Sequence, residues 1–139
     1  MKLYFKQEMQ YFYDGENEYP AYLIAMGEHK GYTFYVKNLN GCHPTAYVQV
    51  PSTHPMYGKR LTDEIPLDVH FGVTYAESSL LPVATSGWFI GWDYGHHTDF
   101  MGYYKPNDGE YLNSLKKWTV DEIIEECVSA CEQLEEMKK

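Results

Sequence analysis

The clearest hydrophobic pattern in the chain lies at its C-terminal end, in TVDEIIEECVSACEQLEEMKK, residues 119 to 139. Apolar side chains recur there at helical spacing, at Val120, Ile124, Cys127, Val128, Cys131 and Leu134. The opposite face carries Glu125, Glu126, Glu132, Glu135 and Glu136. Thr119 and Glu122 have the spacing of a capping box, which marks a helix start. The pattern predicts one amphipathic helix of about five turns.

Alternating apolar and polar residues, the pattern of strands, fill most of the rest. We expect strands over 32–37, 46–50 and 67–75, and shorter ones over 3–6 and 21–26. The segment 67–75, LDVHFGVTY, alternates most regularly of all. The segment 87–94, GWFIGWDY, is apolar on both faces, as is typical of a central strand.

Segments rich in Gly, Pro and Asn separate these elements. They predict a turn at 14–20, a long hairpin loop at 38–45 and loops at 51–66 and 101–115. Together, the expected helix, strands and loops predict a single α+β domain over residues 1–139. Its antiparallel or mixed sheet has about four to six strands, with the C-terminal helix packed on one face.

Charge and composition narrow the possible functions. The net charge of −9 argues against direct nucleic-acid binding, which needs cations on phosphates, although an acidic mimic of DNA stays open. The chain has 3 cysteines, too few for a disulfide framework. No run of residues is long and apolar enough to span a membrane. We therefore expect a cytoplasmic protein. Aromatic residues make up 17% of the chain. A small domain so rich in aromatic residues tends to leave apolar surface exposed to solvent, which favours a homo-oligomer.

Two of the predicted strands bring polar residues together. If the helix covers the face with Trp88, Ile90 and Trp92, the other face shows Asp68, His70, Gly72 and Thr74 beside Gly87, Phe89, Gly91 and Asp93. Glycines in strands often mark a close ligand approach, which predicts a pocket floor. Alternatively, they accommodate a neighbouring aromatic ring or mark bulges.

Further polar residues follow the second of these strands, in the spacing D-x-x-H-H-x-D from Asp93 to Asp99. Histidine and carboxylate ligands could hold a divalent metal, or the two aspartates could accept backbone hydrogen bonds in a turn. Acid–base catalysis by His70 or His96 with Asp68 or Asp93 and hydrogen bonding in a non-catalytic pocket remain equally open. No nucleophile elbow, P-loop or dinucleotide-binding glycine motif is present.

The long loop adds THPMYGKR, residues 53 to 60, with His54, Tyr57, Lys59 and Arg60. Arg60 is the only arginine, so a bidentate clamp on an anion must use it. This loop is either a phosphate-binding element or a solvated charged turn.

Three segments, HPMYGK, DVHFGVTY and GWFIGWDYGHHTD, together with the short acidic helix, resemble a family of small bacteriophage and prophage accessory proteins, mostly from Gram-positive hosts. The pattern of that family runs His-Pro-x-Tyr-Gly, Asp-Val-His-Gly-Gly-x-Thr-Tyr and Trp-x-x-Gly-Phe-Asp-x-x-His-x-x-Asp. The match covers about residues 54–99 and the helix. The chain departs from it at Phe71 and Trp92. The resemblance points to His54, Tyr57, Gly58, Asp68, His70, Gly72, Thr74, Tyr75, Trp88, Gly91, Asp93, His96 and Asp99.

Small phage accessory proteins often counter host defence, so the resemblance implies a protein that sequesters a small nucleotide-like immune signal without catalysis, metal or cofactor. The ligand-binding residues that we expect are His54, Tyr57, Lys59, Arg60, Asp68, His70, Thr74, Gly91, Asp93, His96 and Asp99. Two alternatives remain, namely a metal-dependent hydrolase or phosphodiesterase acting on such a ligand and an acidic protein–protein inhibitor of a host defence complex.

Overall fold

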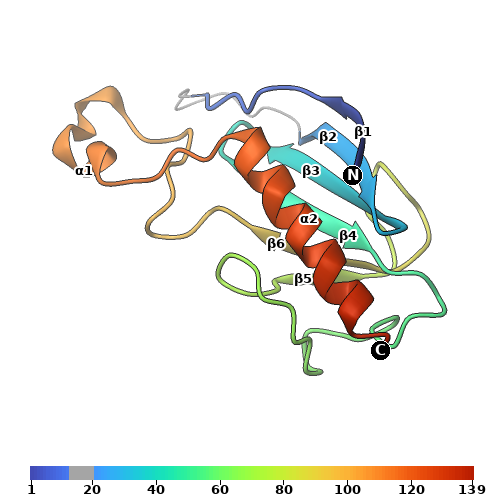
Figure 1. Cartoon of the computed structure of the whole chain (residues 1–139). Helices are drawn as coiled ribbons and strands as arrows, with labels where there is room; N and C mark the ends of the chain where they lie inside the picture. Colours follow the sequence, from blue (N-terminus) through green and yellow to red (C-terminus); the bar gives the residue numbers. More distant parts are fainter. Residues whose placement is uncertain (13–20) are drawn as a thin grey trace.

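A computed structural model describes residues 1–12 and 21–139, so the turn predicted at 14–20 lies outside the described residues. Its sheet is antiparallel throughout, with six strands in the order β1-β2-β3-β4-β6-β5 (Figure 1). The strands are β1 (Lys2–Lys6), β2 (Tyr22–His29), β3 (Tyr32–Leu39), β4 (His43–Gln49), β5 (Tyr75–Glu77) and β6 (Phe89–Asp93). The helix α2 (Val120–Glu136) covers one face, which confirms the predicted α+β fold.

Tight turns join β2 to β3 and β3 to β4. Each contains a residue pair with positive φ, Lys30-Gly31 and Asn40-Gly41, as turns that match the twist of antiparallel strands require. The long hairpin loop predicted at 38–45 is therefore wrong, because the strands continue to Leu39 and resume at His43.

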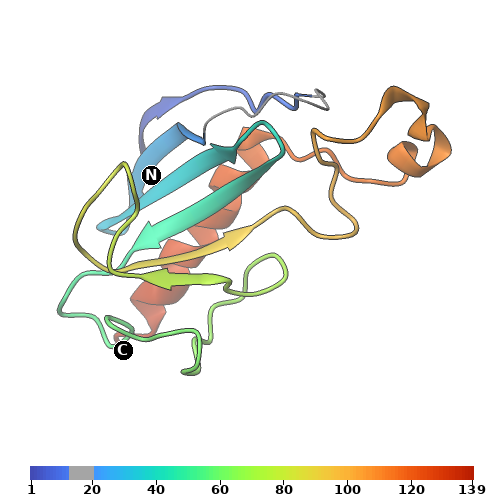
Figure 2. The same cartoon turned by 180° about the vertical axis from the view of Figure 1, so that it is seen from behind.

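The helix α2 packs across β2, β3 and β4 (Figures 1 and 2). Its capping box forms as predicted, since Thr119 Oγ1 accepts from the Glu122 backbone N–H at 3.3 Å and the Glu122 carboxylate accepts from Thr119 N–H at 3.0 Å. The main core lies between helix and sheet and includes Ile24, Phe34, Val36, Ile90, Trp92, Ile123, Cys127 and Leu134. A smaller cluster on the opposite face contains Tyr35, Tyr47, Leu80 and Phe89.

The strand predicted over 67–75 is wrong for residues 67–74, which form turns and irregular chain; only Tyr75–Glu77 pairs in the sheet. The backbone of this segment is held by helix side chains instead. The Gln133 side chain accepts from Asp68 N–H at 2.7 Å and donates to Asp68 C=O at 2.9 Å. Phe71 has φ 57° and Gly72 φ 83°, values outside any strand, so the chain turns there.

The segment 101–115, predicted as loop, contains a 3₁₀ turn η1 (Pro106–Asp108) and a short helix α1 (Glu110–Asn113). Both views show α1 projecting away from the sheet (Figures 1 and 2). Among the described residues, no helix has the length and apolar character needed to cross a membrane.

Candidate functional site

A pocket of about 310 Å³ opens on the sheet face opposite α2. We call it the Thr74–Asp93 pocket; its lining comprises Leu39, His43, Thr45, Tyr47, Thr74, Tyr75, Trp92 and Asp93. The strand register assembles it, because Thr45 lies opposite Asp93 and both Tyr47 and Tyr75 lie opposite Gly91. It thus contains two of the predicted ligand-binding residues, Thr74 and Asp93.

Gly91 allows two tyrosine rings to meet over the sheet. The rings of Tyr47 and Tyr75 lie 5.0 Å apart, edge to face. A Cβ atom at Gly91 would come within 2.4 Å of Tyr47 Cδ1 and 2.7 Å of the Ala46 carbonyl oxygen. The space above this glycine is therefore filled by an aromatic ring, the second of the two interpretations given above, and that ring forms a wall of the pocket.

Asp93 is the charged group of the pocket. Its carboxylate accepts from Thr74 Oγ1 and from the Gly95 N–H, both at 3.0 Å. His96 Nε2 lies 3.2 Å from Asp93 Oδ1, close enough for an ion pair when the ring is protonated but not oriented for a hydrogen bond. Asp93 thus holds the loop after β6 against the segment before β5, while its remaining oxygen lone pairs can accept from a ligand.

The Thr45 hydroxyl is an unusual feature of the same pocket. It lies near the phenol group of Tyr47, whose pKa is raised by burial. The two groups do not meet in hydrogen-bond geometry, so Thr45 Oγ1 is buried without a hydrogen-bond partner among the described residues. A buried hydroxyl of this kind costs free energy that a ligand could recover.

A second carboxylate, Asp99, is buried, with only 1% of its surface exposed. It accepts from His70 Nε2 at 3.0 Å, from Trp118 Nε1 at 2.8 Å and from the His96 backbone N–H at 2.9 Å. These donors satisfy a charge that would otherwise be costly to bury. We call this group, with Phe71 and Tyr94 around it, the His70–Asp99 cluster.

Aromatic stacking fixes the rings of this cluster. His70 stacks on Tyr94, with centroids 4.9 Å apart and planes 10° apart, and Phe71 stacks on His96 at 4.2 Å and 13°. Tyr94 donates to the Glu126 carboxylate at 2.5 Å, and burial together with that carboxylate raises the pKa of Tyr94. The outer ring of this group, Phe71, is 52% exposed.

Asp99 also fixes the chemistry that His70 can perform. Since Nε2 donates to the carboxylate, Nδ1 is the ring nitrogen left to exchange a proton, and no hydrogen bond to it occurs within residues 1–12 and 21–139. A histidine oriented by a buried aspartate in this way can act as a hydrogen-bonding group or as an acid or base.

The other predicted residues lie elsewhere. His54 is 4% exposed; it donates through Nε2 to the Leu134 carbonyl at 2.7 Å and accepts at Nδ1 from Met56 N–H, so it anchors the long loop to α2. Asp68 has an exposed side chain and takes part through its backbone. Tyr57, Lys59 and Arg60 are exposed on the long loop and are absent from the lining of the Thr74–Asp93 pocket.

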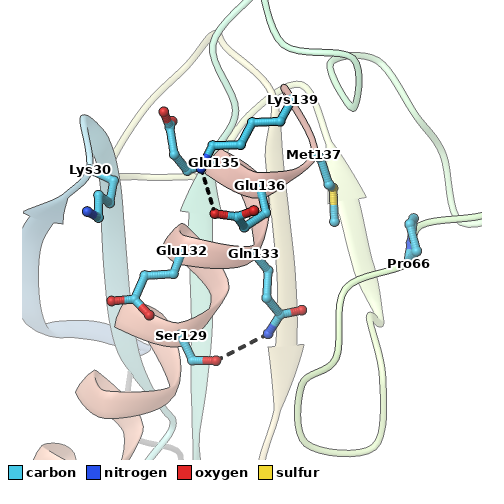
Figure 3. A pocket seen from close by; sticks show the side chains of 9 residues that line it. All are labelled: Lys30, Pro66, Ser129, Glu132, Gln133, Glu135, Glu136, Met137 and Lys139. Atoms are coloured by element: carbon cyan, nitrogen blue, oxygen red, sulfur yellow. Dashed lines mark hydrogen bonds and ion pairs between the residues drawn. The ribbon is translucent and has the colours of Figure 1, made fainter.

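A wider pocket of about 860 Å³ lies beside the C-terminal end of α2 (Figure 3). Its lining comprises Lys30, Pro66, Ser129, Glu132, Gln133, Glu135, Glu136, Met137 and Lys139. Its acidic groups are partly paired within the chain, for example Glu136 with Lys139 at 2.9 Å and Glu132 with His29 at 3.0 Å. None of the predicted ligand-binding residues lines it.

The part of the chain that the structure describes holds no group of three or more His, Cys, Asp or Glu side chains placed to bind a metal ion. Asp93, His96 and Asp99 follow one another closely in sequence, and His96 Nε2 lies 3.2 Å from Asp93, but the Asp99 carboxylate faces other partners. Asp99 faces His70 and Trp118, whereas Asp93 faces Thr74.

Sequence reasoning missed Thr45, Tyr47 and Trp118. The alternation in the fourth strand places Thr45 and Tyr47 on one face, but only the register with β6 shows that they meet Asp93 and Gly91. Nothing in the local sequence links Trp118 to Asp99, because their contact depends on the path of the chain between them.

Comparison with models of protein families, with curated proteins and with solved structures finds no match to this chain. The fold and the geometry of the site therefore carry the functional argument.

Proposed function

We propose that this protein binds a small nucleotide-like ligand in the Thr74–Asp93 pocket and sequesters it without changing it chemically. The observation that carries the proposal is the pocket itself, in which two tyrosine rings, a carboxylate and an unpaired buried hydroxyl converge. Its volume of about 310 Å³ lies at the lower end of the range for small-molecule sites.

The rings of Tyr47 and Tyr75 supply an apolar surface for a planar group. Stacking of a base on an aromatic side chain contributes about 1–3 kcal/mol and accepts any base. Both rings come from strands, so they are already in place before a ligand arrives. A site formed in advance avoids much of the entropy cost of ordering side chains on binding.

The polar groups favour the base and sugar of a nucleotide. Asp93 can accept from a hydroxyl or amino group, and Thr45 Oγ1 can donate to a carbonyl or ring nitrogen. No lysine or arginine belongs to the described lining of this pocket, so we expect a phosphate to point toward solvent.

Sequestration agrees better than catalysis with the way the carboxylates are engaged. Asp93 is tied to Thr74 and Gly95, and Asp99 is buried under three donors. Both carboxylates therefore serve to hold the site in shape. His70, whose ring could transfer a proton, is packed against Tyr94 and Phe71.

The biological setting is part of the proposal. The resemblance of residues 54–99 to phage accessory proteins supports a role in countering a host immune signal, acting in the host cytoplasm. A homo-oligomer stays a prediction that light scattering of the purified protein can check.

The proposal is tested by calorimetric titration with a panel of nucleosides and nucleotides. We expect saturable binding of at least one of them by the wild-type protein, weakened about tenfold or more by Tyr75→Ala through loss of stacking. Tyr103→Ala is the matched control, because Tyr103 is exposed and lies outside the pocket lining. Equal binding by both variants, or recovery of a cleaved ligand, would contradict the proposal.

A further inference from the structure

A second pocket, of about 380 Å³, lies at the β5 edge of the sheet on the side that faces α2. We call it the Arg60 pocket; its lining comprises Arg60, Leu61, Thr62, Ala76, Glu77, Ser78 and Trp88. It shares no lining residue with the Thr74–Asp93 pocket. The long loop 51–66 forms one wall, and β5 with the adjacent Ser78 and with Trp88, just before β6, forms the other.

Arg60 brings a positive charge to this pocket. It is the only arginine in a chain of net charge −9. Its backbone N–H donates to Asp63 Oδ2 at 2.8 Å, which closes the turn, but the described residues supply no ion pair or hydrogen bond to its guanidinium group. A guanidinium group offers five donors in a planar fork that matches an oxyanion.

Trp88 supplies a second donor without an acceptor. Its Nε1 atom is buried and has no hydrogen-bond partner among the described residues. By contrast, Trp92 Nε1 donates to Tyr94 Oη at 3.0 Å and Trp118 Nε1 donates to Asp99 at 2.8 Å. A buried donor left unpaired destabilises the protein until an acceptor reaches it.

The remaining polar groups restrict what can enter. The hydroxyl groups of Thr62 and Ser78 can donate to an anion, while the Glu77 carboxylate would repel one and must instead meet a hydroxyl or amino group. A suitable ligand therefore carries an anionic group at one end and a donor next to it.

We propose that the Arg60 pocket binds a small molecule through an oxyanion, a phosphate or a carboxylate, with Arg60 and the Trp88 indole N–H as donors and Glu77 holding an adjacent hydroxyl or amine. The site is independent of the function proposed above, because the two pockets have separate linings. Arg60 thus serves a ligand of its own rather than the group that packs against the rings of Tyr47 and Tyr75.

The proposal is tested by following the tryptophan indole N–H signals of the ¹⁵N-labelled full-length protein by NMR. Inorganic phosphate and acetate are titrated separately, with sodium chloride at equal ionic strength as the control. We expect a saturable shift of the Trp88 signal, whereas the Trp92 and Trp118 signals, whose donors are engaged, stay in place. The more effective of the two anions identifies the oxyanion.

Variants at two neighbouring positions separate a specific site from general charge effects. Arg60→Gln should weaken the binding at least about tenfold, since it removes charge-assisted hydrogen bonds. Lys59→Gln removes the same charge from the adjacent residue, which does not line the pocket, and should leave the binding unchanged. The proposal is overturned if neither anion shifts the Trp88 signal beyond the effect of chloride, or if Arg60→Gln binds as the wild type does.

Discussion

Replacing Gly91 by alanine tests the packing that forms the aromatic wall of the Thr74–Asp93 pocket. The new Cβ atom would lie 2.4 Å from Tyr47 Cδ1 and 2.7 Å from the Ala46 carbonyl oxygen. Tyr47 is buried against Tyr75, and the carbonyl belongs to a paired strand, so neither can move away freely. Overpacking of this kind costs about 1–3 kcal/mol, offset by about 0.4–1 kcal/mol from the lower entropy of the unfolded chain.

We therefore expect Gly91→Ala to lower the free energy of unfolding by about 1–2 kcal/mol and Tm by about 3–6 °C, as measured by circular dichroism during urea and heat unfolding. The clash with the ring should be relieved in a Tyr47→Leu background. There the same glycine substitution should cost about 1 kcal/mol less, a coupling that a double-mutant cycle measures. Unchanged or increased stability of Gly91→Ala, or an equal cost in both backgrounds, would refute the packing described for this wall.

Three further predictions concern the buried polar groups. Asp99→Ala leaves buried N–H donors without an acceptor and should cost about 2–4 kcal/mol in urea unfolding, whereas Asp68→Ala, at an exposed carboxylate, should stay within about 0.5 kcal/mol of the wild type. Burial raises the pKa of the Cys127 and Cys131 thiols, so both should resist iodoacetamide in the folded protein near neutral pH and react after denaturation; labelling of the folded protein at either would contradict their burial. The pKa of Tyr94 is raised above its usual 10.0, so the contribution of Tyr94 to stability is complete below that pH and should decline as the pH rises further. Urea unfolding at a series of alkaline pH values can follow this decline. Tyr94→Phe should reduce it, and an unaltered decline would contradict the role given to Tyr94.

Local signals in the sequence predicted the helix and most strands well. The capping box of Thr119 and Glu122 depends on residues a single turn apart, so spacing alone reveals it. The pair Asn40-Gly41 likewise fixes a tight turn through its own backbone preferences, although the sequence interpretation placed a longer loop there.

The failure at residues 67–74 has a physical explanation. The alternation of apolar and polar residues indicates which side chains are buried, and Leu67 and Val69 are indeed buried in the core. It says nothing about what pairs with the backbone, which at Asp68 is the Gln133 side chain and not a neighbouring strand. A segment can thus show the periodicity of a strand without belonging to a sheet.

The candidate site was predicted in part. Thr74, Gly91 and Asp93 do lie together, because β5 and β6 are neighbours. The hydrogen bond between His70 and Asp99 has no local signal in the sequence, since the two residues are 29 positions apart and only the tertiary fold brings them within 3.0 Å. Residue types indicated which side chains could bind a ligand, whereas the register decided which of them meet.

The measurement that tests the central claim most directly is native mass spectrometry of the protein purified from a host cell with its defences active. We predict an added mass of nucleotide-like size that is released intact on denaturation and is lost or reduced in Tyr75→Ala but retained in Tyr103→Ala. The absence of any bound mass, a bound mass that survives Tyr75→Ala unchanged, or the release of a cleaved product would contradict sequestration in the Thr74–Asp93 pocket.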